Sequence, residues 1–155
     1  MKTYLVVLTV HSYLRWAVLL LALIVLARSL RGWAGSREWT RVDDRFHAGL
    51  VGAIDLQLLL GLVLYIFLSP MTSAFFADVG AAMKEPALRF FGLEHIAAMV
   101  VAITILHIGR ARGKIAKTPR LRHRRVWVST LIALLLVAAS IPWPFLRYGR
   151  PLLRF

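Results

Sequence analysis

The chain alternates four long apolar stretches with short polar segments. The apolar stretches run from about Tyr4 to Ala27, Phe46 to Leu68, Arg89 to Gly109 and Val126 to Phe145. Each is close to the roughly 20 residues that an α-helix needs to cross a bilayer. Because little more than the connections is left over, the pattern predicts a single all-α domain over residues 1–155. We expect an integral membrane four-helix bundle with four transmembrane helices.

The connection between the second and third apolar stretches, residues 69–88, is the one with room for further structure. It contains Pro70 and Pro86, and between them the stretch Ala74–Met83. We expect that stretch to form a short interfacial helix on the outer surface of the membrane.

The composition agrees with a membrane protein. Hydrophobic residues make up 59% of the chain and charged residues 17%, whereas an average soluble domain has about 45–50% and 25%. The net charge is +13, and most of the Lys and Arg residues lie in the connections 28–45 and 110–125. The positive-inside rule places these connections in the cytoplasm and both termini outside. We interpret the basic segment 110–125, with His123, as a solvated surface that touches lipid headgroups, and we expect no nucleic-acid partner.

Several classes of chemistry are not expected from this sequence. The chain has no cysteine, so it offers no thiolate for a zinc site, an iron–sulfur cluster or the covalent attachment of a c-type haem. It also lacks a Walker loop, a G-x-S-x-G elbow, an H-E-x-x-H pair and a dinucleotide fingerprint. A hydrolase or nucleotide-dependent enzyme is therefore not predicted.

Ionisable residues within the apolar stretches are candidates for function, because charge is costly in a bilayer. They occur in the first three stretches and are His11, Arg15, His47, Asp55, Glu94, His95 and His107. His11 and His95 lie roughly 10 Å below the outer ends of their predicted helices, at 1.5 Å per residue. His47 and His107 both lie close to the inner ends. The four histidines thus form an outer layer and an inner layer.

The two layers indicate a cofactor held between imidazoles of different helices. His95 and His107 are 12 residues apart, which on a helix is a rise of about 18 Å and a rotation of about 120°. They should therefore face different neighbours, His11 in the outer layer and His47 in the inner one. Two imidazoles facing each other across a bundle are typical of a haem iron with two axial histidines. We predict haem b, one or two per chain, with His11, His95, His47 and His107 as axial ligands of the iron.

The polar residues allow two further interpretations, an ion pair of Arg15 and a dinuclear metal site. Arg15 should pair with Asp55, or with Glu94 as second choice, either as a structural ion pair or as part of a proton or quinone site beside the cofactor. A dinuclear metal site would need more carboxylates than Asp55 and Glu94 supply.

Five motifs carry a resemblance that spans most of the chain: HSYLRW (11–16), FHAGLVGAIDLQLLLGLVLY (46–65), RFFGLEH (89–95), IPWPF (141–145) and GRP (149–151). With them the chain resembles small bacterial four-helix membrane proteins labelled cytochrome-b-like. More broadly it is similar to di-haem b-type cytochromes of the bacterial inner membrane, which include quinol-linked electron carriers and superoxide-oxidising proteins. The chain departs from that layout in the spacing of His95 and His107 and in having no histidine in its fourth apolar stretch.

The resemblance implies a multi-pass protein of the bacterial inner (cytoplasmic) membrane that transfers electrons between the quinone pool and an outer-face acceptor. Lipid, quinone or quinol, and a larger redox complex are the expected partners. Whether the chain is itself a quinol- or superoxide-linked oxidoreductase stays open. Two alternatives also stay open: a haem-free accessory or assembly subunit of a larger membrane complex, and a small proton-coupled transporter that uses Arg15, Asp55 and Glu94.

Overall fold

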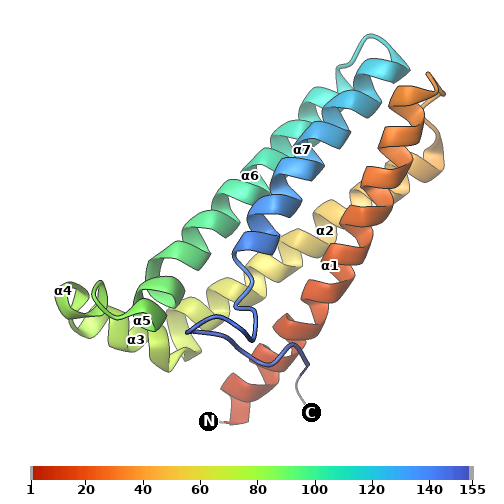
Figure 1. Cartoon of the computed structure of the whole chain (residues 1–155). Coiled ribbons are helices and arrows are strands. Elements are labelled where there is room, and N and C mark those ends of the chain that lie inside the picture. Colours follow the sequence, from red (N-terminus) through yellow and green to blue (C-terminus); the bar gives the residue numbers. More distant parts are fainter. Residues whose placement is uncertain (1, 154–155) are drawn as a thin grey trace.

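A computed structural model describes residues 2–153, and every regular element within that range is helical. Four long helices lie side by side (Figure 1); they are α1 (Lys2–Ala34), α2 (Arg41–Val63), α6 (His95–Lys114) and α7 (Pro119–Ala139). Three short helices lead from α2 to α6 at one end of the bundle, namely α3 (Pro70–Ala77), α4 (Val79–Ala82) and α5 (Pro86–Arg89). The all-α prediction is confirmed.

The described residues contain three helical segments that are long and apolar enough to cross a membrane. These are Lys2–Ala34, Arg41–Leu68 and Pro86–Lys114, the last two including short turns beyond α2 and before α6. The predicted fourth span, Val126 to Phe145, is wrong. Helix α7 begins with a basic segment and ends at Ala139, so its apolar part covers only residues 126–139. At 1.5 Å per residue this part is roughly 21 Å long, less than the roughly 30 Å hydrocarbon core.

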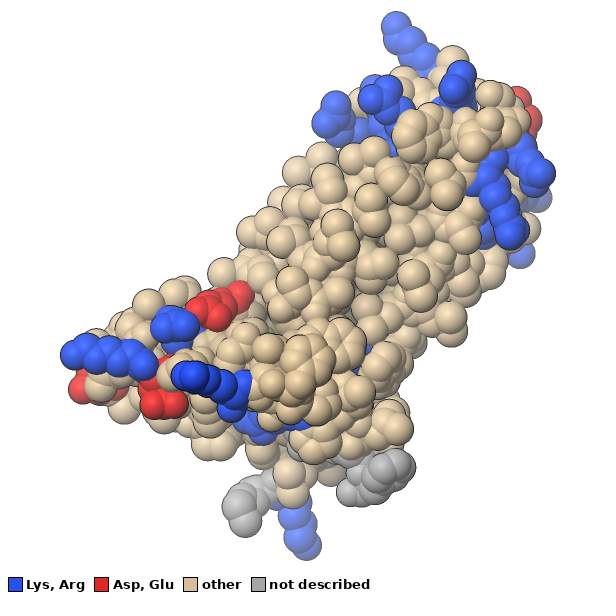
Figure 2. All heavy atoms as spheres, in the orientation of Figure 1, with Lys and Arg blue, Asp and Glu red and all other residues tan. Residues whose placement is uncertain are grey.

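Residues after Ala139 leave the helix because Pro142 and Pro144 cannot continue it. This C-terminal segment, residues 140–153, instead folds back over the end of the bundle that also holds the N-terminus and α3–α5 (Figure 1). We call this end the outer end, and the opposite end, with the α1–α2 and α6–α7 connections, the inner end. In Figure 2, Lys and Arg gather at the inner end, while the middle of the visible face is free of charge.

The connection 69–88 is helical, but it does not form the single helix predicted for Ala74–Met83. Asp78 breaks the helix there: it has an extended backbone, and its side chain caps α4 by accepting from the Ala81 amide at 2.9 Å. Ser69 caps α3 in the same way, ahead of a proline at the first helical position. The result is a short helical layer beside the outer end.

The long helices pack closely through small residues. Contacts are dense between α6 and α7, α1 and α7, and α1 and α2, and much sparser between α2 and α6. Gly109 of α6 lies against Ser129 of α7, where an added Cβ would collide with the serine side chain. The core between the helices is aliphatic, with Val18, Leu50 and Leu106 almost fully buried.

The α1–α2 connection at the inner end is fixed by a capping box. The Thr40 hydroxyl accepts from the Asp43 amide at 3.2 Å, and the Asp43 carboxylate accepts from the Thr40 amide at 2.9 Å. The other oxygen of Asp43 forms an ion pair with Arg28 of α1 at 2.8 Å. Together these contacts set where α2 begins relative to α1.

Candidate functional site: a two-histidine cavity at the outer end

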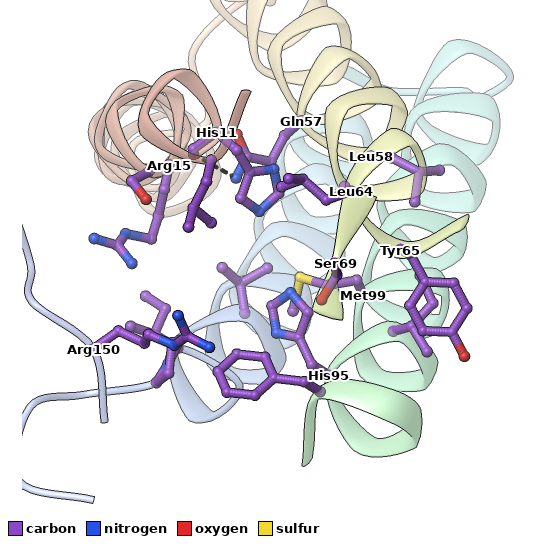
Figure 3. Close-up of a pocket in the computed structure, with 18 of the residues that line it drawn as sticks. His11, Arg15, Gln57, Leu58, Leu64, Tyr65, Ser69, His95, Met99 and Arg150 are labelled. Atoms are coloured by element: carbon purple, nitrogen blue, oxygen red, sulfur yellow. Dashed lines mark hydrogen bonds between the residues drawn. The ribbon is translucent and has the colours of Figure 1, made fainter. Parts of the chain in front are cut away.

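A cavity of about 150 Å³ lies inside the outer end of the bundle. Its walls come from α1, the outer half of α2, the start of α6 and the C-terminal segment (Figure 3). Most of the lining is apolar, for example Val18, Leu58 and Met99. His11 of α1 and His95 of α6 both line it and lie on different walls. The predicted outer pair of histidines is therefore brought together in one cavity.

His95, the first residue of α6, is held by the C-terminal segment. Its Nδ1 lies 2.8 Å from the carbonyl oxygen of Ser140. Because a carbonyl only accepts, Nδ1 must carry the proton and donate it. The neutral ring then has its lone pair on Nε2. A histidine that donates Nδ1–H to a backbone carbonyl in this way is oriented as metal-binding histidines usually are.

His11 is positioned by α2 rather than by the C-terminal segment. The Gln57 side-chain amide donates to the His11 carbonyl oxygen at 3.0 Å, which links the two helices at this level. Gly61 lies beside the His11 ring, where an added Cβ would be only 3.2 Å from Cε1. The buried Nδ1 atom of His11 forms no hydrogen bond within residues 2–153. Buried nitrogens without a partner are uncommon in folded proteins.

Two arginines add positive charge at the cavity. Arg15 lies one helical turn after His11 and donates to the Leu152 carbonyl oxygen at 2.9 Å. The guanidinium of Arg150 stacks over the Phe91 ring at 4.7 Å from its centroid. Both side chains lie to one side of the imidazole pair (Figure 3). A ligand with an acidic group would be favoured on that side of the cavity.

Two π-helical turns flank the cavity. The turn η1 (Leu64–Leu68) follows α2, and η2 (Phe90–Glu94) directly precedes His95. Tyr65 in η1 donates to the Gly92 carbonyl oxygen of η2 at 2.6 Å. Turns of this kind are rare overall, but where they occur they are often at functional sites. A wider turn changes the direction in which the following side chains point. Here η2 sets the direction of His95.

The inner histidines are not brought together in the same way. His47 is only 2% exposed and packs edge-on against the Trp39 ring at 6.2 Å between centroids. His107 is about half exposed, and its Nε2 lies 2.7 Å from Asp55 Oδ1. Neither is among the described residues that line the cavity. The structure therefore joins only the outer pair of the four predicted ligands.

His123 also differs from expectation. The sequence places it in a solvated basic segment, yet it is only 2% exposed. It belongs to α7, lies 4.8 Å from Trp39 between ring centroids, and sits where a side chain on Gly32 would be. Gly32 on the facing helix makes room for the buried ring. The basic residues around His123 along the chain gave no sign of this burial.

The intramembrane polar residues have partners other than the predicted ones. Asp55 pairs with His107 rather than with Arg15. Glu94 pairs with Arg89 at 2.6 Å, on the exposed side of the outer end. Arg15 binds the backbone of the C-terminal segment. The predicted Arg15–Asp55 pair is therefore not the arrangement in this structure.

Sequence reasoning missed the contribution of the C-terminal segment. Ser140 holds His95, while Ile141, Pro142 and Arg150 form part of the wall. The available signal was the pair of motifs IPWPF and GRP, in which closely spaced prolines and a glycine predict a fixed turn. At Gly149 an added Cβ would collide with three backbone carbonyl oxygens, so this turn requires glycine.

Within residues 2–153, no group of three or more His, Cys, Asp and Glu side chains is placed to hold a metal ion. The imidazoles that line the cavity are those of His11 and His95.

The chain matches no protein-family model, no curated protein and no solved structure. Its function is therefore argued from the geometry of this cavity.

Proposed function

We propose that the protein is a membrane b-type cytochrome in which His11 and His95 are the axial ligands of one haem. The observation that carries this proposal is the pair of imidazoles on different walls of one apolar cavity. His95 has its Nδ1 tied to a carbonyl, which leaves Nε2 as the ligand atom. His11 has a buried ring nitrogen without a hydrogen bond.

The donor set fits haem, whereas the volume requires part of the wall to move. At about 150 Å³ the cavity is below the roughly 300–1,000 Å³ of ordinary ligand pockets. The C-terminal segment is the wall best suited to move, because it has no continuous helix and crosses the outer end. Its contacts with the helices include Arg15 and Trp16, which both donate to the Leu152 carbonyl oxygen.

A haem bound here would supply one-electron redox chemistry, and the chain's own residues would determine how that chemistry is used. The aliphatic wall excludes water from the iron, which affects the reduction potential. Arg15 and Arg150 provide positive charge for the acidic groups of the macrocycle. A site near the outer end suits a carrier that passes electrons from the quinone pool to an outer-face acceptor.

Absorbance and haem content test this proposal. The chain is purified in detergent from haem-replete cells, and the reduced-minus-oxidised spectrum and the haem-to-protein ratio are recorded. We expect a b-type spectrum and one haem per chain. A colourless protein would contradict the proposal and would favour the haem-free accessory subunit. Two haems per chain would show that the inner histidines also bind, contrary to their packing here.

A further inference from the structure

The polar pair Asp55–His107 lies on the outside of the bundle, away from the cavity. The carboxylate oxygen Oδ1 and the imidazole Nε2 are 2.7 Å apart, and each side chain is 47% exposed. The neighbouring exposed side chains are apolar, for example Leu56, Leu59 and Ile108. Both partners belong to segments that are apolar enough to span a membrane. In a bilayer this pair would therefore face lipid, where polar side chains are costly unless they serve a function.

The surface next to the pair is open. Gly49 and Gly52 precede Asp55 on α2, and a Cβ added to either would meet nothing within 4 Å. Contacts between α2 and α6 are sparse compared with the other helix pairs. Thr104, one turn before His107 on α6, has its hydroxyl bound to the Val100 carbonyl oxygen. The surface of α2 beside the pair therefore carries no side chain at these two positions.

The pair has hydrogen-bonding capacity left. Asp55 Oδ2 is an acceptor, and His107 Nδ1 is a second acceptor in the tautomer whose Nε2–H donates to Asp55 Oδ1. No other hydrogen bond within residues 2–153 uses either atom. A fitting ligand therefore donates a hydrogen bond to Asp55 and is apolar enough to arrive through lipid.

We propose that Asp55 and His107 bind the hydroxyl group of a membrane-soluble quinol, which reaches them from the lipid over the open helix surface at Gly49 and Gly52. A quinol carries the O–H donors that the two free acceptors require. The oxidised quinone has only acceptors, so the same site disfavours it. This inference rests on the proposed function for its choice of the quinone class, and it places the site of that partner on this chain.

A binding measurement on the full-length chain in lipid nanodiscs tests the site. Radiolabelled decylubiquinol is added under anaerobic reducing conditions, decylubiquinone is added in a parallel oxidised sample, and the amount bound to empty nanodiscs is subtracted. We expect one quinol per chain, bound about tenfold or more tightly than the quinone, as the loss of one hydrogen bond to a charged group implies. Equal binding of both forms, or none above empty nanodiscs, would overturn the proposal.

Three variants locate the binding. Asp55→Asn weakens the acceptor, and Gly52→Leu places a side chain on the open surface one helical turn before Asp55; each should weaken quinol binding by about tenfold or more. Asp44→Asn is the matched control, because Asp44 is also on α2, is 46% exposed and forms an ion pair at 2.8 Å with Arg122. It should bind quinol as the unchanged chain does. Undiminished binding by Asp55→Asn would show that this pair is not the site.

Two further readouts keep the alternatives apart. If Gly52→Leu converts a two-chain particle into a one-chain particle and no quinol binds, the surface around Gly52 is a contact between copies and the proposal fails. Haem content is measured on the same samples. Quinol binding without haem would support the quinol site and contradict the cytochrome proposal. Haem without quinol binding would support the cytochrome proposal and contradict the quinol site.

Discussion

The outer and inner ends of the bundle both contain buried histidines, and they differ in what surrounds the rings. At the outer end His11 and His95 face a cavity, and His95 is oriented by the Ser140 carbonyl. At the inner end His47 and His123 both pack against the Trp39 ring. The same residue type is thus directed at open space in one region and used as a packing ring in the other.

This difference shows that the room around a histidine is as informative as its depth in the membrane. The inner rings also have buried nitrogens without hydrogen bonds, His47 Nε2 and His123 Nδ1. Among the described residues, His11 and His95 line a cavity between different helices, whereas His47 and His123 do not line it. We therefore propose cofactor binding at the outer end and helix packing at the inner end.

The largest expected effect comes from removing a ligand at each end. His95→Ala should lower the haem-to-protein ratio by at least about tenfold, because losing a direct ligand should cost no less than the 10–100-fold typical of losing its supporting contact. His47→Gln is the matched control, since it replaces a buried histidine at the inner end and should keep the haem. Absorbance per mole of purified chain gives both values. Loss of haem in a folded His47→Gln variant would show that the inner end, too, is needed for haem binding and would contradict this assignment.

A second prediction concerns packing at the inner end. Gly32→Ala places a methyl group where the His123 ring lies, so either the ring must shift or α1 and α7 must separate. Overpacking of this kind costs about 1–3 kcal/mol, which should appear as a lower unfolding midpoint in a denaturant titration in detergent. Haem per folded chain should not change. An unchanged midpoint would mean that the ring moves aside freely and that the inner end is not tightly packed.

Glycines on α2 give a finer comparison of the same kind. Gly49→Ala enters open space and should stabilise the helix by about 0.5–1 kcal/mol, as alanine is the better helix former. Gly61→Ala brings a methyl group to 3.2 Å from His11 Cε1. It should therefore stabilise the helix less than Gly49→Ala does, or not at all. It should also shift the haem absorption bands. Identical unfolding midpoints and spectra for the two variants would contradict the placement of His11 beside Gly61.

An effect of similar size is expected at the α1–α2 connection. Thr40→Ala removes the capping hydroxyl of α2 and should cost about 1 kcal/mol. Because Thr40 is at the inner end, the haem absorption spectrum should stay the same. A denaturant titration and a spectrum of the same sample check both statements, and a changed spectrum would show that the two ends are coupled.

The sequence predicted depth along the helices better than direction around them. His11 and His95 were matched in level from the rise per residue alone, and the structure places both in one cavity. The direction of His95 also depends on the π-helical turn before it, which a 3.6-residue period does not represent. The partner of Asp55 was missed for a related reason, since the direction of a side chain depends on how two helices cross.

The predicted fourth span failed because hydropathy was counted across a helix end. The apolar stretch from Val126 to Phe145 is continuous in composition, but the chain turns after Ala139 and uses its last apolar residues to close the cavity. The prolines in this stretch marked the turn. What they could not give was the destination of the segment, which depends on contacts with distant residues such as Arg15 and Trp16.

The central claim, an iron held by His11 and His95 together, is tested most directly by low-temperature electron paramagnetic resonance of the oxidised protein. The account predicts one low-spin ferric species with two imidazole ligands in the unchanged chain. In His11→Ala and in His95→Ala, any haem that remains should be high-spin, while His47→Gln should keep the low-spin signal. A high-spin or absent signal in the unchanged chain, or a low-spin signal that survives in both ligand variants, would contradict it.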